Sequence, residues 1–280
     1  MLASAAGQGI RRTAALLRTL GRSPHGMRLT EVAAASGLSK STVHRLLAAL
    51  TRVGLVEQDE LTSNFHLSFE FFSLGATAAN RYGLVELAHK HLVRIEERCH
   101  DTVFLSVRAG NEAICVHRIE GRFPIKVLTL AVGDRRPLGV GAGSLALLAF
   151  LPDHEISALL KASAREIRKF PGLNARLIGT LVRETRRNQY SFNAGRIIPD
   201  MCAIGVPVLG PDRRPVAAIS IAAIAARMKP ARRAQLLRHL REGARELEAA
   251  IAELTAGLSP VGLRQLAQID GGRTVLGYAD

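Results

Sequence analysis

The chain has 280 residues, which is enough for two domains, and 48% of them are hydrophobic, so sizeable cores can form. Its formal net charge of +14 favours a polyanionic partner such as nucleic acid, with an acidic membrane surface as the alternative. Three isolated cysteines exclude a disulfide scaffold and a CxxC zinc site. No apolar run approaches the roughly 20 residues of a membrane helix, and the start of the chain lacks the pattern of a secretory signal. We therefore expect a cytoplasmic protein with no membrane partner.

Helical spacing of apolar residues predicts a first helix over residues 11–20. The next stretch, residues 29–50, reads LTEVAAASGLSKSTVHRLLAAL and predicts two short helices that meet at Gly37. Glycine suits a tight turn there because it adopts positive φ freely. Ser39 can cap the second helix, and the apolar positions of that helix share one face: Val43, Leu46, Leu47 and Leu50. This is the pattern of a helix-turn-helix motif.

The other face of the second helix carries short polar and basic side chains, which suit the major groove of DNA. The candidate DNA-binding residues are Ser39, Lys40, Ser41, Thr42, His44 and Arg45. An ordinary helical hairpin with solvated charges is the alternative. Two apolar runs around a polar turn at residues 52–67 predict a β-hairpin, which would complete a winged helix.

Residues 69–100 have apolar positions at helical spacing and predict a linker helix that is interrupted near Gly83. Beyond it, strands are predicted at residues 102–107, 113–119, 124–131, 190–197, 201–209 and 215–222. Helices are predicted at residues 145–150, 153–161, 174–188 and 230–254. The pattern indicates an α+β fold with a mainly antiparallel sheet. The predicted domains are residues 10–68, a linker at 69–100, a second domain at 101–256 and a flexible tail at 257–280.

A glycine-rich segment, residues 139–143, precedes a predicted helix, and backbone N–H groups at a helix N-terminus bind anions. Its GxGxG spacing differs from the dinucleotide pattern GxGxxG, and the GK[ST] of a P-loop is absent, so a small carboxylate or another compact anion is the better candidate ligand. Cys202 and Ser220 have no base near them in sequence, which argues against nucleophilic catalysis. His89 and His91 are two apart on a helix and cannot share a metal ion. We predict no enzymatic activity, no metal and no cofactor.

The order of these parts resembles the IclR family of bacterial transcription regulators. The likeness extends over about residues 10–255. The segments that carry it are GLSKSTVHRLL at 37–47, GLV at 54–56, GAGSLALLA at 141–149, YSF at 190–192, IGVPV at 204–208 and AAISI at 217–221.

The resemblance implies a GAF-like effector domain that binds a small organic acid or an aromatic catabolite. Carried over by motif, it points to Gly141 and Ala142 as backbone donors to the effector. It also points to further effector-binding residues, which are Asn193, Cys202, Ser220 and Ala222. The family commonly has a basic residue where Ser144 stands in this sequence.

We therefore predict a ligand-responsive DNA-binding regulator, acting as a repressor, of a catabolic or transport operon. A single helix-turn-helix makes a small interface with DNA, so a homodimer on a near-palindromic operator is expected, or a dimer of dimers. Two alternatives stay open. One is an enzyme that acts on a small carboxylate through the C-terminal domain, and the other is a protein that binds polyanions non-specifically through its charge.

Overall fold

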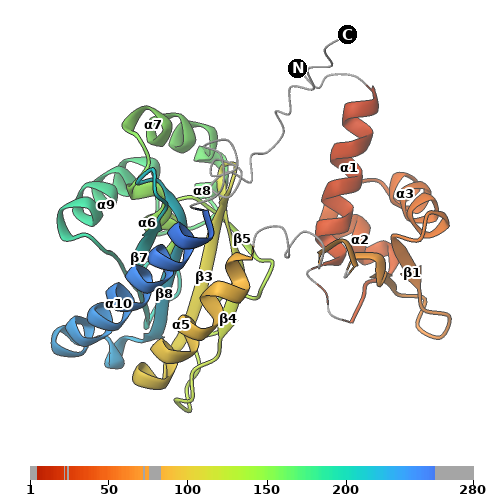
Figure 1. Cartoon of the computed structure of the whole chain (residues 1–280). Helices are drawn as coiled ribbons and strands as arrows, with labels where there is room; N and C mark the ends of the chain where they lie inside the picture. The colour runs from red at the N-terminus through yellow and green to blue at the C-terminus, as the bar shows by residue number, and fades with distance from the viewer. Residues whose placement is uncertain (1–4, 22, 24, 72, 76–82, 256–280) are drawn as a thin grey trace, which may run out of the picture. The chain divides into compact units, whose positions relative to one another are not determined.

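The computed structural model describes residues 5–21, 23, 25–71, 73–75 and 83–255, and these form two compact units that divide between residues 82 and 83. Figure 1 labels the helices and strands of both units. The predicted tail lies outside the described residues. The predicted α+β fold, with an N-terminal winged helix-turn-helix and a C-terminal antiparallel sheet, is confirmed.

The described part of the N-terminal unit includes three helices that pack with a two-stranded antiparallel hairpin. These are α1 (Ala5–Leu20), α2 (Leu29–Ser36), α3 (Lys40–Arg52), β1 (Val56–Gln58) and β2 (Phe65–Leu67). α1 begins six residues earlier than the predicted first helix. The apolar faces of all three helices and the hairpin meet in one core, whose buried members include Leu16, Val32, Val43, Leu47 and Phe65. Burial of these faces fixes α3 with its polar side outward.

The turn between α2 and α3 has the predicted geometry. Gly37 has φ 67° and ends α2 in the left-handed region, which glycine adopts without a steric penalty. Ser39 caps α3, because its Oγ accepts a hydrogen bond from the N–H of Thr42 at 3.4 Å. The local sequence therefore determines where the second helix of the motif starts.

The C-terminal unit is built on a six-stranded antiparallel sheet with the order β5-β4-β3-β8-β7-β6. The strands are β3 (Thr102–Ala109), β4 (Glu112–Ile119), β5 (Arg135–Pro137), β6 (Ser191–Ala194), β7 (Met201–Leu209) and β8 (Pro215–Ile224). Both pairs of neighbours at the centre, β3 with β8 and β8 with β7, are antiparallel. The predicted antiparallel sheet is thus confirmed.

The strand predicted at residues 124–131 is wrong, since this segment is irregular and the third strand of the C-terminal unit is the short β5. Two carbonyl groups of the segment bind arginine side chains. Arg118 Nη1 donates to the Leu130 carbonyl at 2.9 Å, and Arg136 Nη2 donates to the Thr129 carbonyl at 2.7 Å. Side chains therefore take the hydrogen-bonding role that a neighbouring strand would otherwise have.

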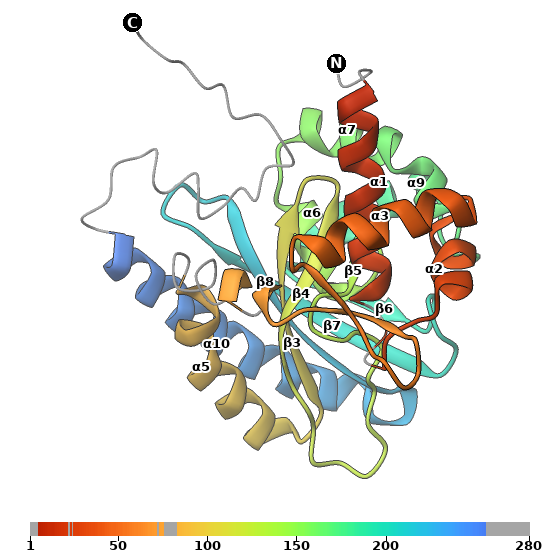
Figure 2. The same ribbon diagram turned by 90° about the vertical axis from the view of Figure 1, so that its right-hand side faces the viewer.

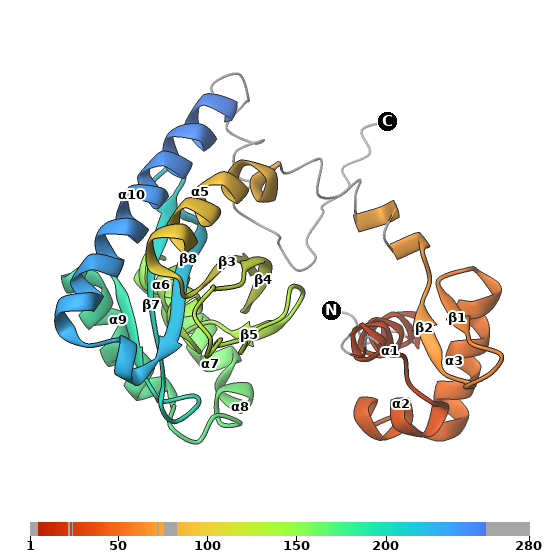
Figure 3. The same cartoon turned by 90° about the horizontal axis from the view of Figure 1, so that it is seen from below.

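Helices cover both faces of the sheet, as Figures 1 and 3 show. On one face lie α5 (Leu84–Cys99) and α10 (Pro230–Thr255), which pack side by side. The other face carries α6 (Ala142–Ala149), α7 (Asp153–Ala162), α8 (Ala164–Ile167) and α9 (Ala175–Asn188). The second half of the predicted linker is α5, and it packs within the C-terminal unit. No helix of the described part is long and apolar enough to cross a membrane.

Side chains of β3 alternate between the two faces of the sheet. Val103, Leu105 and Val107 belong to the core shared with α5 and α10, whereas Phe104 and Ser106 point to the opposite side. Figure 2 gives a second view of β3 beside β4 and β8. One strand thus contributes both to the core under α5 and to the pocket described below.

Candidate DNA-binding helix and effector pocket

The six predicted DNA-binding residues lie at the N-cap and in the first half of α3. Lys40 and His44 are one helical turn apart, as are Ser41 and Arg45, and all four side chains are exposed. Among the described residues, no carboxylate forms an ion pair with Lys40 or Arg45. The N-terminal half of α3 is therefore a polar and cationic surface on a helix that is anchored by its apolar side. DNA contact by these residues stays a prediction.

Ser39 and Thr42 have structural roles in this surface. Ser39 Oγ lies 2.9 Å from Thr42 Oγ1 and 3.2 Å from Ser41 Oγ, in addition to its bond with the Thr42 N–H. These contacts order the first turn of α3. The long basic side chains beyond them are left available for a partner.

The tip of the wing is acidic. Asp59 Oδ1 accepts hydrogen bonds from the N–H groups of Leu61 at 3.0 Å and Thr62 at 2.6 Å. The hydrogen bond from the Thr62 backbone lowers the pKa of Asp59, so the carboxylate stays ionised at neutral pH. A negative tip repels phosphate, and α3 is thus the more suitable DNA-facing element of this unit.

A pocket lies in the C-terminal unit at the N-terminus of α6. It encloses about 640 Å³ of space between atoms, part of which is open to solvent. All six predicted effector-binding residues line it: Gly141, Ala142, Asn193, Cys202, Ser220 and Ala222. The fold thus brings together residues that are up to 81 positions apart in sequence, from 141 to 222. That they bind an effector stays a prediction.

The first turn of α6 presents unpaired backbone donors to this pocket. Gly141 has φ 99° at the N-cap, and the first intrahelical bond runs from the Leu145 N–H to its carbonyl. The N–H groups of residues 141–144 have no hydrogen-bond partner within the described ranges. All four residues line the pocket. Such a helix N-terminus attracts an anion through its free N–H groups and its dipole.

Two contacts hold this helix end against the sheet. Ser191 Oγ on β6 donates to the Ala142 carbonyl at 2.6 Å. A Cβ on Gly205 of β7 would stand 3.0 Å from the carbonyl carbon and oxygen of Ala142, so glycine permits the close approach. The donors of α6 are therefore held in place before any ligand binds.

Ser144, at the position where the family commonly has a basic residue, closes the loop before α6. Its Oγ donates to the Pro137 carbonyl at 2.9 Å and accepts from the Gly139 N–H at 3.0 Å. The residue is buried, and its hydroxyl both donates and accepts a hydrogen bond within this loop. Ser144 thus has a structural role, and it does not replace a cation.

Two serine hydroxyls face the same pocket. The exposed fractions of Ser106 and Ser220 are 4% and 7%, and neither hydroxyl has a hydrogen-bond partner among the residues that the structure describes. Their Oγ atoms lie 3.4 Å and 3.1 Å from the point where a Cβ on Gly143 would stand. The sequence analysis predicted Ser220 and missed Ser106, whose place on the pocket face of β3 follows only from the sheet register.

Asn193 and Cys202 lie on the neighbouring strands β6 and β7. Asn193 Oδ1 accepts a hydrogen bond from the Arg196 N–H at 3.3 Å, which orients the amide. Burial raises the pKa of the Cys202 thiol, so it stays protonated at neutral pH. Cys202 can pack against a ligand in this state but is a poor nucleophile.

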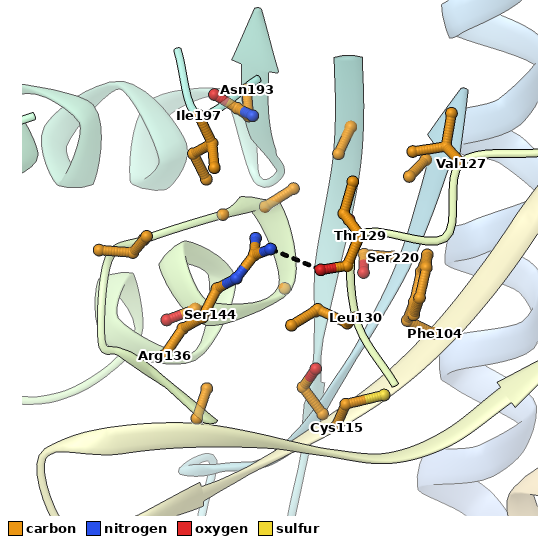
Figure 4. Close-up of a pocket in the computed structure, with 18 of the residues that line it drawn as sticks. Phe104, Cys115, Val127, Thr129, Leu130, Arg136, Ser144, Asn193, Ile197 and Ser220 are labelled. Atoms are coloured by element: carbon orange, nitrogen blue, oxygen red, sulfur yellow. Dashed lines mark hydrogen bonds between the residues drawn. The ribbon is translucent and has the colours of Figure 1, made fainter. Parts of the chain in front are cut away.

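Arg136 is a second pocket residue, besides Ser106, that the sequence analysis did not identify. It is half-buried, and burial lowers the pKa of its guanidinium. Nη2 donates to the Thr129 carbonyl, and Nη1 lies 3.5 Å from the Cβ position of Gly141. Figure 4 shows this side chain extending across the pocket to Thr129, with Ser220 nearby. The only sequence signal is its place just before the glycine-rich loop.

The pocket also has an apolar wall. Phe104, Cys115, Val127 and Ala222 form a small buried cluster, with Leu130 and Met201 packed against it. All six residues line the pocket. A cavity with cationic and N–H donors at one side and an apolar wall at the other suits a small amphipathic acid.

The two histidines considered in the sequence have separate partners. His89 Nδ1 lies 2.9 Å from His117 Nε2, and His91 Nδ1 lies 2.8 Å from Glu246 Oε2. Within the described ranges, no three His, Cys, Asp or Glu side chains come together as a metal site.

Comparison with protein families gives two matches along the chain. Residues 9–60 match the IclR helix-turn-helix domain, and residues 76–249 match the domain described as bacterial transcriptional regulator IclR C-terminal. The second match alone covers more than half of the 280 residues.

Similar proteins of known role include three transcription regulators. BhcR of Paracoccus denitrificans is 30% identical over 233 residues, 81% of each chain. KipR of Bacillus subtilis is 29% identical over 222 residues, 78% of this chain and 87% of KipR. The transcriptional repressor IclR of Escherichia coli is 26% identical over 225 residues, 76% of this chain and 79% of the repressor.

Solved structures share the fold. An IclR transcriptional regulator from Alicyclobacillus acidocaldarius aligns with a TM-score of 0.73 at 21% identity, covering 87% of this chain and 98% of that one. An IclR homologue from Microbacterium hydrocarbonoxydans, solved with 4-hydroxybenzoate, aligns with a TM-score of 0.72 at 20% identity. The alignment covers 88% of this chain and 99% of the homologue.

Proposed function

This chain belongs to the IclR family of bacterial transcription regulators, and from that membership we propose that it is a ligand-responsive repressor of a catabolic or transport operon. Its effector is a small organic acid or an aromatic catabolite, and it acts in the cytoplasm. The similar repressor IclR of E. coli supports the role of a repressor. The 4-hydroxybenzoate complex of the M. hydrocarbonoxydans homologue supports an aromatic acid as effector.

The observation that carries the proposal is the pairing of two sites in one chain. α3 presents an unpaired cationic surface, and the α6 pocket presents unpaired N–H donors beside an apolar wall. A small acid in the pocket would satisfy those donors.

In this proposal α3 contacts the DNA, and Lys40, His44 and Arg45 bind base edges or phosphates. One such helix gives a small interface, so we propose a homodimer, or a dimer of dimers, on a near-palindromic operator. An effector changes DNA affinity only if it binds one arrangement of the two reading heads more tightly than another. α5, which follows the junction between the units, is the structural element that would transmit the change.

A footprint of the full-length protein tests the proposal. The purified chain is incubated at physiological salt with the DNA that flanks its own gene, with a scrambled duplex as control. We expect protection of one two-fold-related site. Addition of small acids should then release the protection, which is the expected direction for a repressor.

The variant Lys40→Ala/Arg45→Ala distinguishes specific reading from attraction by charge alone. Its matched control is Lys161→Ala/Arg165→Ala, which removes the same charge from exposed positions on α7 and α8. Loss of protection only in the first variant supports reading by α3. Weak uniform coverage that disappears in both variants and with added salt would contradict the proposal.

A further inference from the structure

Building on the proposed function, we propose that Arg136 makes this pocket selective for a carboxylate, and that Ser106 and Ser220 bind a second oxygen of the same ligand. The effector class is thereby narrowed to a compact carboxylic acid with one hydroxyl or carbonyl oxygen outside its carboxylate. Neutral aromatic compounds are excluded.

Among the residues that the structure describes, no carboxylate forms an ion pair with the guanidinium of Arg136. This guanidinium is half-buried and donates to one neutral acceptor, the Thr129 carbonyl. A guanidinium has five N–H donors in a fixed fork, so most of its bonding capacity is unused. Loss of hydration without a counter-ion is unfavourable, and an anionic ligand would supply that counter-ion.

The one carboxylate that lines the pocket does not fill this role. Asp134 Oδ2 accepts a hydrogen bond from the Ala131 N–H at 2.8 Å, within its own loop. Asp134 raises the pKa of Arg136 against the larger effect of burial, so it is near the guanidinium but not bonded to it. The Arg136 fork therefore stays available to a ligand.

Arg136 lies at the positive end of the α6 dipole, so the two attract the same anion. Its Nη1 lies 3.5 Å from the Cβ position of Gly141, which is the N-cap of α6. The guanidinium and the unpaired N–H groups of residues 141–144 thus adjoin each other. A carboxylate between them would receive charge-assisted hydrogen bonds from both.

The serine pair defines the second part of the site. Both serine residues are more than nine-tenths buried and line the cavity, and their hydroxyls have no partner among the described residues. They lie next to Gly143, which follows Gly141, the residue beside the guanidinium, by two positions. A purely hydrocarbon acid would leave them unsatisfied, whereas a ligand hydroxyl or carbonyl would satisfy them. Hence we infer an oxygen outside the carboxylate.

Isothermal titration calorimetry of the full-length protein with matched probes tests the inference. The acids are lactate and 4-hydroxybenzoate. Lactamide and 4-hydroxybenzamide remove the charge, and propanoate and benzoate remove the second oxygen. We expect at least one of the two acids to bind, its amide to bind about 10- to 100-fold more weakly, and its deoxygenated analogue to bind several-fold more weakly.

Variants assign these losses to residues. Arg136→Gln, which can still donate to the Thr129 carbonyl, should weaken binding of the acid about 10- to 100-fold and remove the preference for the acid over the amide. Arg136→Lys should retain part of the affinity for the acid and part of this preference. Arg135→Gln is the matched control, because Arg135 pairs with Glu112 at 2.8 Å outside the pocket and its loss should leave binding unchanged. Ser106→Ala/Ser220→Ala should abolish the preference over propanoate or benzoate.

Three results would overturn the inference: an amide that binds as tightly as its acid, an Arg136→Gln variant with unchanged affinity, or the absence of binding by both acids. The ligand-free melting temperature of each variant shows that it is folded. Operator binding is measured separately. If a neutral compound released the operator, the proposed function would stand and the inference would fail. If acids bound through Arg136 without any effect on operator binding, the inference would stand and the proposed function would fail.

Discussion

Ser220 Oγ on β8 lies 3.1 Å from the point where a Cβ atom on Gly143 would stand. Gly143 is in the first turn of α6, where the backbone is helical and would accept alanine without strain. The side chain is therefore excluded by the pocket wall and not by the helix. Glycine at this position keeps space for the two serine hydroxyls.

Gly143→Ala should weaken ligand binding while leaving the operator affinity of the ligand-free protein unchanged. The added methyl group displaces the Ser220 and Ser106 hydroxyls from the cavity. Calorimetry with the acid that binds best gives the measurement. Gly179→Ala on α9 is the control, because its Cβ would meet only the end of the flexible Arg183 side chain, at 4.0 Å, and should stabilise the helix by about 0.5–1 kcal/mol. Equal ligand affinity in Gly143→Ala and the unmodified protein would contradict the prediction.

Arg136→Gln should increase the free energy of unfolding of the ligand-free C-terminal unit, by about 0.5–1 kcal/mol. The reason is that an unpaired, half-buried charge is removed. Arg135→Gln should have no such effect or lower stability slightly, because it breaks the pair with Glu112. Denaturant unfolding of both variants provides the comparison. A destabilised Arg136→Gln protein would show that the guanidinium serves the fold.

Arg45→Ala should weaken specific operator binding by about 1–3 kcal/mol if its side chain contacts a base edge. If Arg45 contacts only phosphate, the loss should be similar for specific and scrambled DNA, and the salt dependence should decrease. Titrations at several salt concentrations separate the two cases. Arg165→Ala, an exposed charge on α8, should behave as the unmodified protein.

Ser39 offers a test that separates capping from DNA contact. Ser39→Asp retains a good N-cap and places a negative charge at the N-terminus of α3, so the N-terminal unit should keep its stability. The same charge should repel phosphate and weaken DNA binding. Ser39→Ala should instead lower stability by about 1 kcal/mol. Thermal unfolding and operator titration of both variants form the experiment, and unchanged DNA affinity in Ser39→Asp would place Ser39 away from the DNA.

Alkaline pH should destabilise the C-terminal unit through its buried thiols. Burial raises the pKa of Cys99 to about 12 and that of Cys115 to about 11, from an ordinary value of 9.0. Between pH 9 and these raised pKa values, the native state therefore binds more protons than the unfolded state. The contribution of the thiols to the free energy of unfolding is fully present below pH 9 and is lost as the pH rises towards 12.

The pH effect of Cys99 is isolated by comparison with Cys99→Ala, because lysine and tyrosine residues titrate in the same range. The loss of unfolding free energy between pH 8 and pH 10.5 should be smaller in this variant than in the unmodified protein. An equal loss in both proteins would contradict the assignment.

The sequence predicted correctly those helices and strands that are determined by nearby residues. Gly37 and Ser39 determine the turn and the start of α3, and the apolar period of α10 predicts a helix over nearly its observed length. Strands β7 and β8 were identified from uninterrupted apolar runs. Each of these signals lies within the segment that it describes.

The errors concern features that depend on distant residues. The alternating residues at 124–131 resemble a strand, but arginine side chains from β4 and β5 bind the carbonyls of that segment. The environment of Arg136 is likewise set by Thr129, Gly141 and the sheet behind them. No spacing rule in the sequence describes such an arrangement. The six pocket residues came from the family resemblance, and their proximity in the fold could not have been derived from periodicity.

The alternation along β3 has a consequence for evolution. Phe104 and Ser106 meet the ligand space, whereas Val103, Leu105 and Val107 belong to the core with α5 and α10. Substitutions on the first set can change ligand preference with little effect on the second. Natural variation, or an engineer who builds a biosensor, can therefore exchange the recognised compound while the packing beneath α5 is preserved.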